Sequence, residues 1–461
     1  MVSIGFIYFC SVIKNNYELQ NDGTMKNILS RKTFIVLPLF LFLLHPLWGQ
    51  KSNFKNDICV PGKLYMLSDI RNDVFVEALI KRWRPYNDFV RFSGDCVYSR
   101  KLNRVASVDT PVDGSNMKIE LVNSDEFETI KEKAISICVG KKGIGTQEVT
   151  VQILGDSFVN GAFFRDALLS KNYIPGIKLV GLRNIKNEEG QYDEGRGGWT
   201  VKKYFEIPKG EMTSYHGYMQ PVGEYRYWGS CEFWKNCYKV INGELTDTEI
   251  VYNCGRYDQC ITKFDKETGY LAAPKKNDLM YDNARGSYMV YTGKKWKNVE
   301  IDERKWAFNY RKYLDMWNLD APKFFAQMLG LNDYRDSLTA DYREWNKKIA
   351  EMKESYYKAV PDGKFIILIP CTTCGSLNNI RGDFTLRQNA AMWQLRKNII
   401  DTFDGRESEG YYVVDIGITI DNEKGYNRNR DGIQTGNPHP YPNYPTMGIP
   451  LAAFIQYYRE L

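Results

Sequence analysis

The sequence lacks the features that mark nucleic-acid-binding and membrane-spanning proteins. Its 62 basic and 56 acidic residues nearly balance, and no Lys/Arg block is long enough for a nucleic-acid footprint. No apolar run reaches the roughly 20 residues that a transmembrane helix needs. A long apolar segment of the kind that forms a lipase lid is also missing. We therefore expect a soluble protein whose partner is neither nucleic acid nor a membrane.

The N-terminus has the layout of a secretory signal. Arg31 and Lys32 precede an apolar run over 34–44, and Leu47-Trp48-Gly49 follows, which is the basic, apolar and small-residue order of such a signal. We expect residues 1–49 to comprise an upstream segment and a signal peptide that is cleaved near Gly49. The mature protein would then be secreted or periplasmic.

Ten cysteines are present, and loss of Cys10 with the leader would leave an odd number. Four of them lie symmetrically about one midpoint: Cys231, Cys237, Cys254 and Cys260. Such symmetry is the condition for opposed pairs in an antiparallel hairpin. The cysteines of an exported protein also meet an oxidising environment, in which disulfides form. The sequence thus predicts disulfides Cys231–Cys260 and Cys237–Cys254. A zinc site is the competing interpretation, but the spacing is wider than zinc ligands usually show.

The chain divides into regions of different periodicity. Residues 50–145 carry short alternating runs separated by turn residues, which predicts a small antiparallel β-domain. Residues 146–461 predict an α/β domain, interrupted at about 201–315 by a Tyr/Trp/Gly-rich insertion, and Pro450 suits the first turn of a last helix. Apolar runs in this part are spaced widely enough for helices between them: 149–154, 177–181, 323–329, 365–370 and 411–416. Several are apolar on both faces, as parallel strands covered by helices are.

A serine follows the first of these strands, in the turn Gly155-Asp156-Ser157. Ligands bind beyond the carboxyl ends of strands in open α/β sheets, and free backbone N–H groups there can stabilise negative charge. A nucleophile belongs in such a place. The tripeptide alone is weak evidence, because any strand-to-helix turn favours these residues.

Three further blocks follow in order. A glycine-rich stretch spans Glu194-Gly195-Arg196-Gly197-Gly198-Trp199-Thr200, and Gly330-Leu331-Asn332-Asp333 ends a later strand. The third block is Asn437-Pro438-His439-Pro440, just before the last helix. Of the three histidines, His45 falls in the leader and His216 in the insertion, so His439 is the one left in the α/β domain.

These four blocks in this order resemble those of the SGNH (GDSL-like) hydrolases, over roughly residues 150–461. The resemblance implies a three-layer α/β/α SGNH-hydrolase sandwich with a mainly parallel sheet, here behind the small N-terminal β-domain. It also implies that Ser157 is the nucleophile and His439 its base. The backbone N–H groups of Ser157 and Gly198 and the amide of Asn332 would form the oxyanion hole. Neither a metal nor another cofactor is expected.

The sequence departs from the family at one position. The family usually has Asp three residues before the His, where this chain has Gly436. The imidazole would then be oriented by a backbone carbonyl, by Asp431 or by Asn437. Either the chain uses a Ser-His dyad or its site is impaired.

The version of the glycine block found here resembles that of exported bacterial members thought to deacylate carbohydrates. We therefore expect a secreted esterase that removes an acyl group, most simply acetyl, from a carbohydrate. Trp199, Tyr227 and Trp228 are candidates for stacking on the sugar, although packing within the insertion would explain them too. The alternatives are a glycan-binding protein on an impaired SGNH scaffold, and a lipase or thioesterase of the same fold.

Overall fold

The computed structural model describes residues 57–81, 88–95, 97–100, 104–123, 127–160, 165, 168–169, 172–183, 192–210, 215–241, 263–371, 386–421, 425–426, 439–440 and 444–459. They belong to one compact unit, Asn56–Leu461. The expected signal peptide lies outside the described residues, as do Cys254 and Cys260. No helix in the ranges given above is both long and apolar enough to cross a bilayer.

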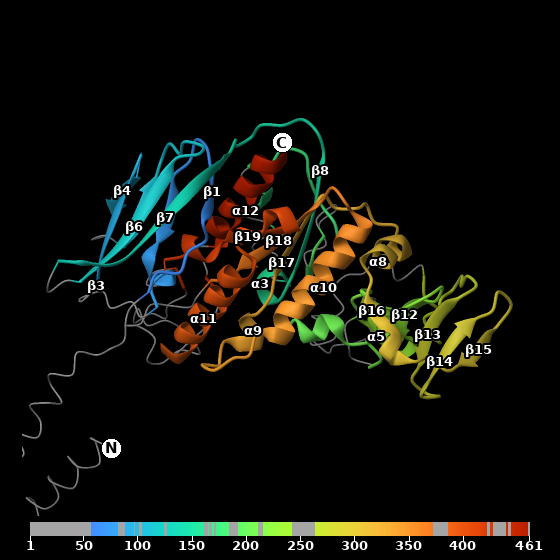
Figure 1. Cartoon of the computed structure of the whole chain (residues 1–461). Coiled ribbons are helices and arrows are strands. Elements are labelled where there is room, and N and C mark those ends of the chain that lie inside the picture. The colour runs from blue at the N-terminus through green and yellow to red at the C-terminus, as the bar shows by residue number, and fades with distance from the viewer. Residues whose placement is uncertain are drawn as a thin grey trace, which may run out of the picture. The chain divides into compact units, whose positions relative to one another are not determined.

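A parallel sheet forms the centre of this unit (Figure 1). Its strands run in the order β10-β8-β17-β18-β19, with β9 beside β8, and every pairing is parallel. The strands are β8 (Val149–Gly155), β9 (Ile177–Leu179), β10 (Glu194–Gly195), β17 (Phe324–Met328), β18 (Lys364–Ile369) and β19 (Tyr411–Asp415). All five predicted apolar runs are strands of this sheet, so the expected mixed α/β fold with a parallel sheet is confirmed.

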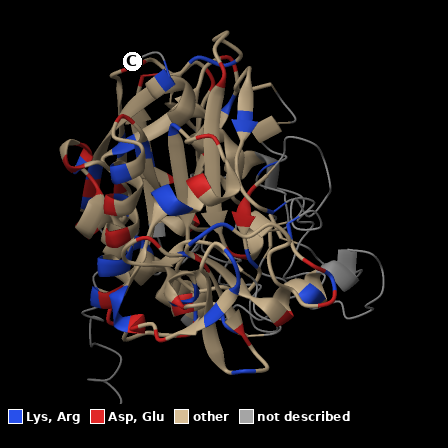
Figure 2. Ribbon diagram, turned by 90° about the vertical axis from the view of Figure 1, so that its right-hand side faces the viewer, with Lys and Arg blue, Asp and Glu red and all other residues tan. Residues whose placement is uncertain are grey.

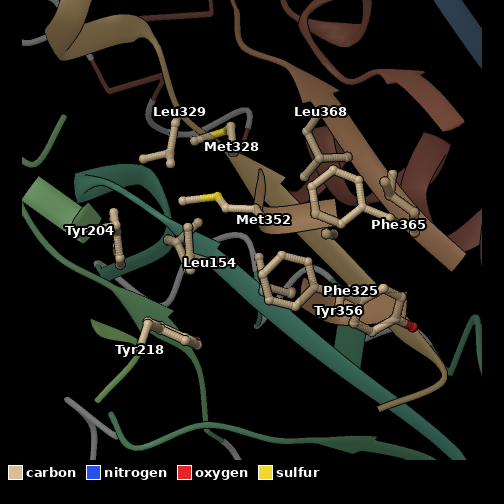
Figure 3. Packing of buried hydrophobic residues seen from close by; sticks show 14 of the residues in the cluster. Leu154, Tyr204, Tyr218, Phe325, Met328, Leu329, Met352, Tyr356, Phe365 and Leu368 are labelled. Carbon is tan, nitrogen blue, oxygen red and sulfur yellow. The ribbon is translucent and has the colours of Figure 1, made fainter. Parts of the chain in front are cut away.

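Helices pack on both faces of the sheet. They are α8 (Tyr310–Trp317), α10 (Arg343–Ala359), α11 (Leu386–Phe403) and α12 (Tyr444–Arg459). Successive strand residues point to opposite faces. On one face, the ring of Phe325 lies 5.4 Å from Tyr356 of α10 and 5.5 Å from Phe365 (Figure 3). On the other face, the ring of Phe324 lies 6.2 Å from Phe454 of α12.

The helices follow from their apolar spacing. The buried residues of α10 recur every three or four positions, which makes one continuous apolar stripe toward the sheet: Trp345, Ile349, Met352, Tyr356 and Ala359. Helix α12 begins at Tyr444, so the prediction that Pro450 lies in its first turn is wrong. Pro450 is inside the helix, and the chain enters α12 closer to His439 than the sequence indicated.

The N-terminal strands form two smaller sheets around a core of their own. One has the order β1-β7-β6-β3, in which β1 and β7 run parallel and the other pairs antiparallel. The second is antiparallel, with the order β2-β5-β4. The strands are β1 (Lys63–Leu67), β2 (Asn72–Phe75), β3 (Asp88–Gly94), β4 (Val97–Arg100), β5 (Val105–Val108), β6 (Asn116–Asn123) and β7 (Thr129–Gly140). Helix α12 packs against β1 and β7 as well as against β19. It therefore lies between the central sheet and the N-terminal sheet that contains β1 and β7.

The insertion contains a four-stranded sheet, β12-β13-β14-β15, and the antiparallel pair β11 and β16. Its elements are β11 (Met219–Pro221), β12 (Arg226–Ser230), α5 (Cys231–Ile241), β13 (Asp278–Asp282), β14 (Ser287–Tyr291), β15 (Trp296–Val299) and β16 (Trp306–Phe308). Figure 2 shows acidic and basic residues interspersed over the ribbon seen from this side.

The cysteine hairpin predicted in this region is wrong. Cys231 and Cys237 lie on α5, where each residue turns the side chain by about 100°, so they do not share a face as they would on a strand. Cys231 is a free thiol, and its Sγ lies 3.8 Å from Oδ1 of Asn283. The Cys231–Cys260 disulfide is therefore not formed in this structure. The partner proposed for Cys237 lies outside the described residues.

Short elements complete the described chain. They are α3 (Ser157–Asn160), α9 (Leu331–Tyr334) and the 3₁₀ turns η1 (Val76–Ala78), η2 (Lys202–Phe205), η3 (Glu303–Lys305), η4 (Glu407–Glu409) and η5 (Gly417–Thr419). Three of them follow strands of the central sheet directly: α3 follows β8, α9 follows β17 and η5 follows β19. They gather at the carboxyl edge of the sheet, where an open α/β fold binds its ligands.

Candidate active site

Ser157 is the first residue of α3 and is partly exposed. Asp156 caps the helix: its carboxylate Oδ1 accepts from the N–H of Phe158 at 3.0 Å, and its carbonyl accepts from Asn160. Aspartate is a preferred residue at this position for that reason. The cap fixes the turn that presents Ser157 beyond the end of β8.

Glycine is required where β10 approaches this helix. A Cβ atom on Gly195 would lie 2.1 Å from the backbone nitrogen of Asn160. The carbonyl of Gly155 also accepts from the N–H of Arg196 at 2.8 Å, which fastens the glycine block to the end of β8. The block therefore runs directly beside the first turn of α3.

Gly198 lies in the turn that follows. Its φ of +73° is in the left-handed region that favours glycine, and it is exposed. The N–H of Trp199 donates to the carbonyl of Arg196 and closes the turn. The predicted donor at Gly198 thus lies on an exposed turn that Arg196 anchors to the end of β8, two residues before Ser157.

Asn332 connects the predicted blocks. It lies on α9, directly after β17, and its side-chain Nδ2 donates to Oδ2 of Asp156 and to the carbonyl of Trp199, both at 3.2 Å. The structure therefore brings together the Ser157 turn, the glycine block and the Asn332 segment. To donate to an oxyanion, the Asn332 amide would have to exchange or share one of these two bonds.

Burial changes the acidity of the carboxylates around Asn332. Desolvation raises the pKa of Asp156 to about 7, and the Asp333 carboxylate adds to the rise, whereas the Phe158 N–H opposes it. Desolvation likewise raises the pKa of Asp333 to about 6 against the N–H of Val201. Asp156 is buried and Asp333 is half-buried, and each accepts hydrogen bonds from the backbone or from Asn332.

His439 lies beside the Ser157 turn. Its ring centroid is 5.0 Å from that of Phe158, the residue after Ser157. Desolvation lowers the pKa of His439 to about 4, so the imidazole is neutral at pH 7 and able to accept a proton. The candidate orienting residues Asp431 and Asn437, and Gly436 itself, lie outside the described residues.

Two residues that the sequence analysis did not single out hold the site together. The carboxylate of Asp333 accepts from the N–H of Val201 at 3.0 and 3.2 Å and so anchors the chain just after the Gly198 turn. The hydroxyl of Tyr204 donates to the carbonyls of Gly155 at 2.7 Å and Glu194 at 2.6 Å. The Asp in Gly-x-Asn-Asp was a signal for the first; a tyrosine among many in this chain gave none for the second.

The predicted sugar-stacking aromatics are core residues. Tyr227 has no exposed surface, and its hydroxyl donates to the carbonyl of Pro208. Trp228 is buried with its Nε1 donating to Asp278 at 3.0 Å. Trp199 is also buried, with its ring 5.7 Å from that of His216. Stacking on a substrate is therefore wrong for Tyr227 and Trp228, and packing within the insertion explains them.

No protein-family model and no curated protein matches the sequence. Distant matches are found among solved structures. A carbohydrate esterase of family 3 from Talaromyces cellulolyticus is 12% identical, with a TM-score of 0.30, and the match covers 68% of this chain and 99% of that one. An acetyl esterase mutant with acetate is 13% identical, with a TM-score of 0.30 and the same coverage. A peptidoglycan O-acetylesterase is 11% identical, with a TM-score of 0.31, over 68% of this chain and 93% of that one.

Proposed function

We propose that this chain is an exported serine esterase that removes an acyl group, most simply acetyl, from a carbohydrate. The observation that supports it best is the meeting of three segments at the carboxyl edge of the sheet. Ser157 begins α3, Asn332 reaches the residue before it, and the neutral ring of His439 packs on the residue after it. A nucleophile, a proton acceptor and an amide donor are thus contributed to one small region.

The chemistry would proceed in two displacements. Ser157 Oγ adds to the acyl carbon while its proton passes to the His439 imidazole. Collapse of the tetrahedral intermediate breaks the ester C–O bond, and the sugar oxygen leaves with the proton from the imidazolium. Water then adds to the acyl-Ser157 ester, with His439 again as the base, and the free acid and Ser157 are released.

The charge on the carbonyl oxygen would be met by the N–H groups of Ser157 and Gly198 and by the Asn332 amide. We infer that Asn332 exchanges its 3.2 Å bond to Trp199 for one to the oxyanion and keeps its bond to Asp156. A hydrogen bond to a full charge is about twice as strong as one to a neutral carbonyl, which favours the exchange only when the oxyanion is present. This is the differential binding that lowers a barrier.

The proposal of a carbohydrate substrate depends on the sequence. The signal over residues 1–49 is typical of export, the glycine block resembles that of carbohydrate-deacylating enzymes, and no lipase-like lid segment is found.

Hydrolysis of a small aryl acetate by the mature protein tests the reaction. We expect cleavage by the parent and its loss in Ser157→Ala and His439→Ala, whereas Ser115→Ala, in a turn of the N-terminal strands, retains it. A fluorophosphonate should label the parent at Ser157 and leave Ser157→Ala unlabelled. A folded parent that neither cleaves the ester nor reacts with the probe would overturn the esterase.

The second candidate is a glycan-binding protein on an impaired scaffold. Gly436 favours it, because the usual carboxylate that orients the histidine is replaced by glycine. It predicts sugar binding that is the same in the parent and in Ser157→Ala, without ester cleavage by either. The aryl acetate assay therefore separates the two candidates.

A further inference from the structure

A cavity of about 420 Å³ lies where the N-terminal strands, the segment after β19 and helix α12 meet. This volume is within the range of about 300–1,000 Å³ typical of small-ligand pockets. Its polar lining is contributed by three separate segments of the chain: Arg71, Asn72 and Asp73 from the N-terminal part, Thr419 and Asp421 after β19, and Thr446 from α12. The catalytic chemistry proposed above uses none of these residues.

The polar groups of the cavity are already held in place. The Nε of Arg71 donates to Oδ2 of Asp73 at 3.1 Å, and the Ser107 hydroxyl donates to Oδ1 of the same carboxylate. The Thr446 hydroxyl donates to the carbonyl of Thr419 at 3.1 Å. A ligand would therefore meet an Asp73 carboxylate and a Thr446 hydroxyl that are pre-organised, and an Arg71 guanidinium on a half-exposed side chain.

The remaining lining is apolar. Leu64, Met66, Ile449 and Pro450 contribute aliphatic surface to the same cavity, and Tyr65 and Phe75 line it with rings that are almost fully buried. Carboxylate oxygens accept hydrogen bonds from the hydroxyl groups of a sugar, and a guanidinium donates to the oxygens of those hydroxyl groups. Apolar surface covers the C–H face of the sugar ring. Two carboxylates, Asp73 and Asp421, against the single guanidinium of Arg71 disfavour an anionic ligand.

We infer that this cavity binds an uncharged sugar ring, and that it holds a part of the glycan chain away from the ester that is cleaved. The inference rests on the proposed function for its link to catalysis, but the binding itself does not. It gives the N-terminal part a role, since β2 supplies Asp73 and the residue before β2 is Arg71. It also links recognition to the reaction, because α12 carries Thr446 and the chain enters that helix from His439.

Binding is tested on the mature Ser157→Ala protein by titration calorimetry with xylohexaose, cellohexaose and mannohexaose. We expect at least one to bind, with Kd raised at least tenfold by Arg71→Ala and by Ile449→Trp, which fills the cavity. Trigalacturonate, an anionic probe, should bind at least tenfold more weakly than the best neutral one. Arg304→Ala is the matched control, because Arg304 also pairs with an aspartate two residues away, at 2.9 Å, on an exposed turn outside the cavity.

Catalysis supplies an independent measurement. In an active parent, Arg71→Ala should raise KM for an acetylated polysaccharide of the sugar that binds and leave aryl acetate hydrolysis unchanged. Absence of binding by all three neutral probes, or equal binding by Ile449→Trp, would overturn the cavity proposal even if the protein is an esterase. Binding that Ile449→Trp abolishes, in a parent without esterase activity, would support the cavity and overturn the catalytic proposal.

Discussion

The side-chain amide of Asn332 donates to a carboxylate oxygen of Asp156 at 3.2 Å, and so joins the end of β17 to the residue immediately before Ser157. Its other hydrogen bond reaches the carbonyl of Trp199, next to the Gly198 turn. One side chain thus contacts both segments that carry the other proposed oxyanion donors. A displacement of Asn332 is therefore expected to disturb both segments, whereas the loss of either contact alone would disturb one of them.

Replacing Asn332 by alanine should lower kcat for aryl acetate hydrolysis by about 100- to 1,000-fold, the cost typical of removing one oxyanion donor. The reason is that the charge on the intermediate loses a donor at the moment it forms. Steady-state kinetics on the purified variant measure the effect. Asn298→Ala, an exposed asparagine on β15, is the control and should leave kcat unchanged. An Asn332→Ala enzyme with parental kcat would remove this residue from the oxyanion hole.

The pH dependence should report the buried state of His439. Burial lowers the pKa of His439 to about 4. The imidazole therefore remains unprotonated at pH values well below 6.5, the ordinary pKa of histidine. We expect kcat/KM to stay constant from pH 7 down to about 5 and to fall near pH 4. An acid limb near pH 7 would contradict this and would indicate Asp156, whose pKa is raised to about 7; Asp156→Asn should then abolish that limb.

The same shift has a consequence for stability. A folded-state pKa below the unfolded value of 6.5 means that the unfolded chain binds the proton more readily. His439 therefore disfavours folding increasingly as pH falls from about 6.5 to about 4. His439→Gln should reduce this part of the fall in Tm over that window, and an unchanged difference between the two proteins from pH 7 to pH 4 would refute the assignment.

Gly195→Ala should disrupt the start of α3. The added Cβ would lie 2.1 Å from the backbone nitrogen of Asn160, a contact that requires the backbone to move. We expect a lower Tm and loss of Ser157 labelling by a fluorophosphonate. In Gly62→Ala the new Cβ would lie 3.5 Å from the Asp404 carboxylate, which is ordinary contact, so this variant should retain both properties.

The buried pair of Arg396 and Asp415 should be sensitive to removal of one partner. The guanidinium binds both carboxylate oxygens, and both side chains are almost fully buried. Arg396→Met leaves an unpaired buried carboxylate and should lower the free energy of unfolding by about 3–5 kcal/mol, measured by urea denaturation.

Protonation should relieve that cost. Burial raises the pKa of Asp415 and Arg396 opposes the rise, so the carboxylate of Arg396→Met takes up a proton more easily. The deficit should thus be smaller at pH 5 than at pH 8. Arg343→Met, which breaks an exposed pair at the start of α10, should have little effect at either pH. A deficit that grows toward low pH would contradict this account.

The central sheet could be predicted from sequence because its signal is local. Strands such as β8 and β18 are apolar runs of six or seven residues, shorter than an ordinary helix, and turn residues bound them; length and flanking residues therefore indicate buried strands. The Ser157 turn was predictable for a similar reason, since Asp156 is a preferred helix cap. That Asn332 would reach Asp156 was a matter of tertiary contact, and no spacing in the sequence encodes it.

The insertion was harder to predict because its cysteines and aromatic residues are compatible with more than one local structure. Symmetric cysteines suggested strands, but Cys231–Ile241 places its apolar residues at helical spacing, and tertiary packing on β12 and β13 selects the helix. Tyr227 and Trp228 were candidates for a binding surface because aromatic residues serve both surfaces and cores. Only the buried partners of their polar atoms distinguish the two uses.

Helix α12 packs on β19 on one side and on β1 and β7 on the other, with the ring of Phe454 4.8 Å from Tyr65 and 5.5 Å from Tyr412. The N-terminal strands are therefore part of the packing of α12 and cannot be removed or exchanged independently of that helix. A truncated chain that begins at β8 would leave one side of its last helix uncovered and prone to aggregation. A chimaera made from this protein and another should accordingly take its N-terminal strands and its α12 from the same one of the two proteins.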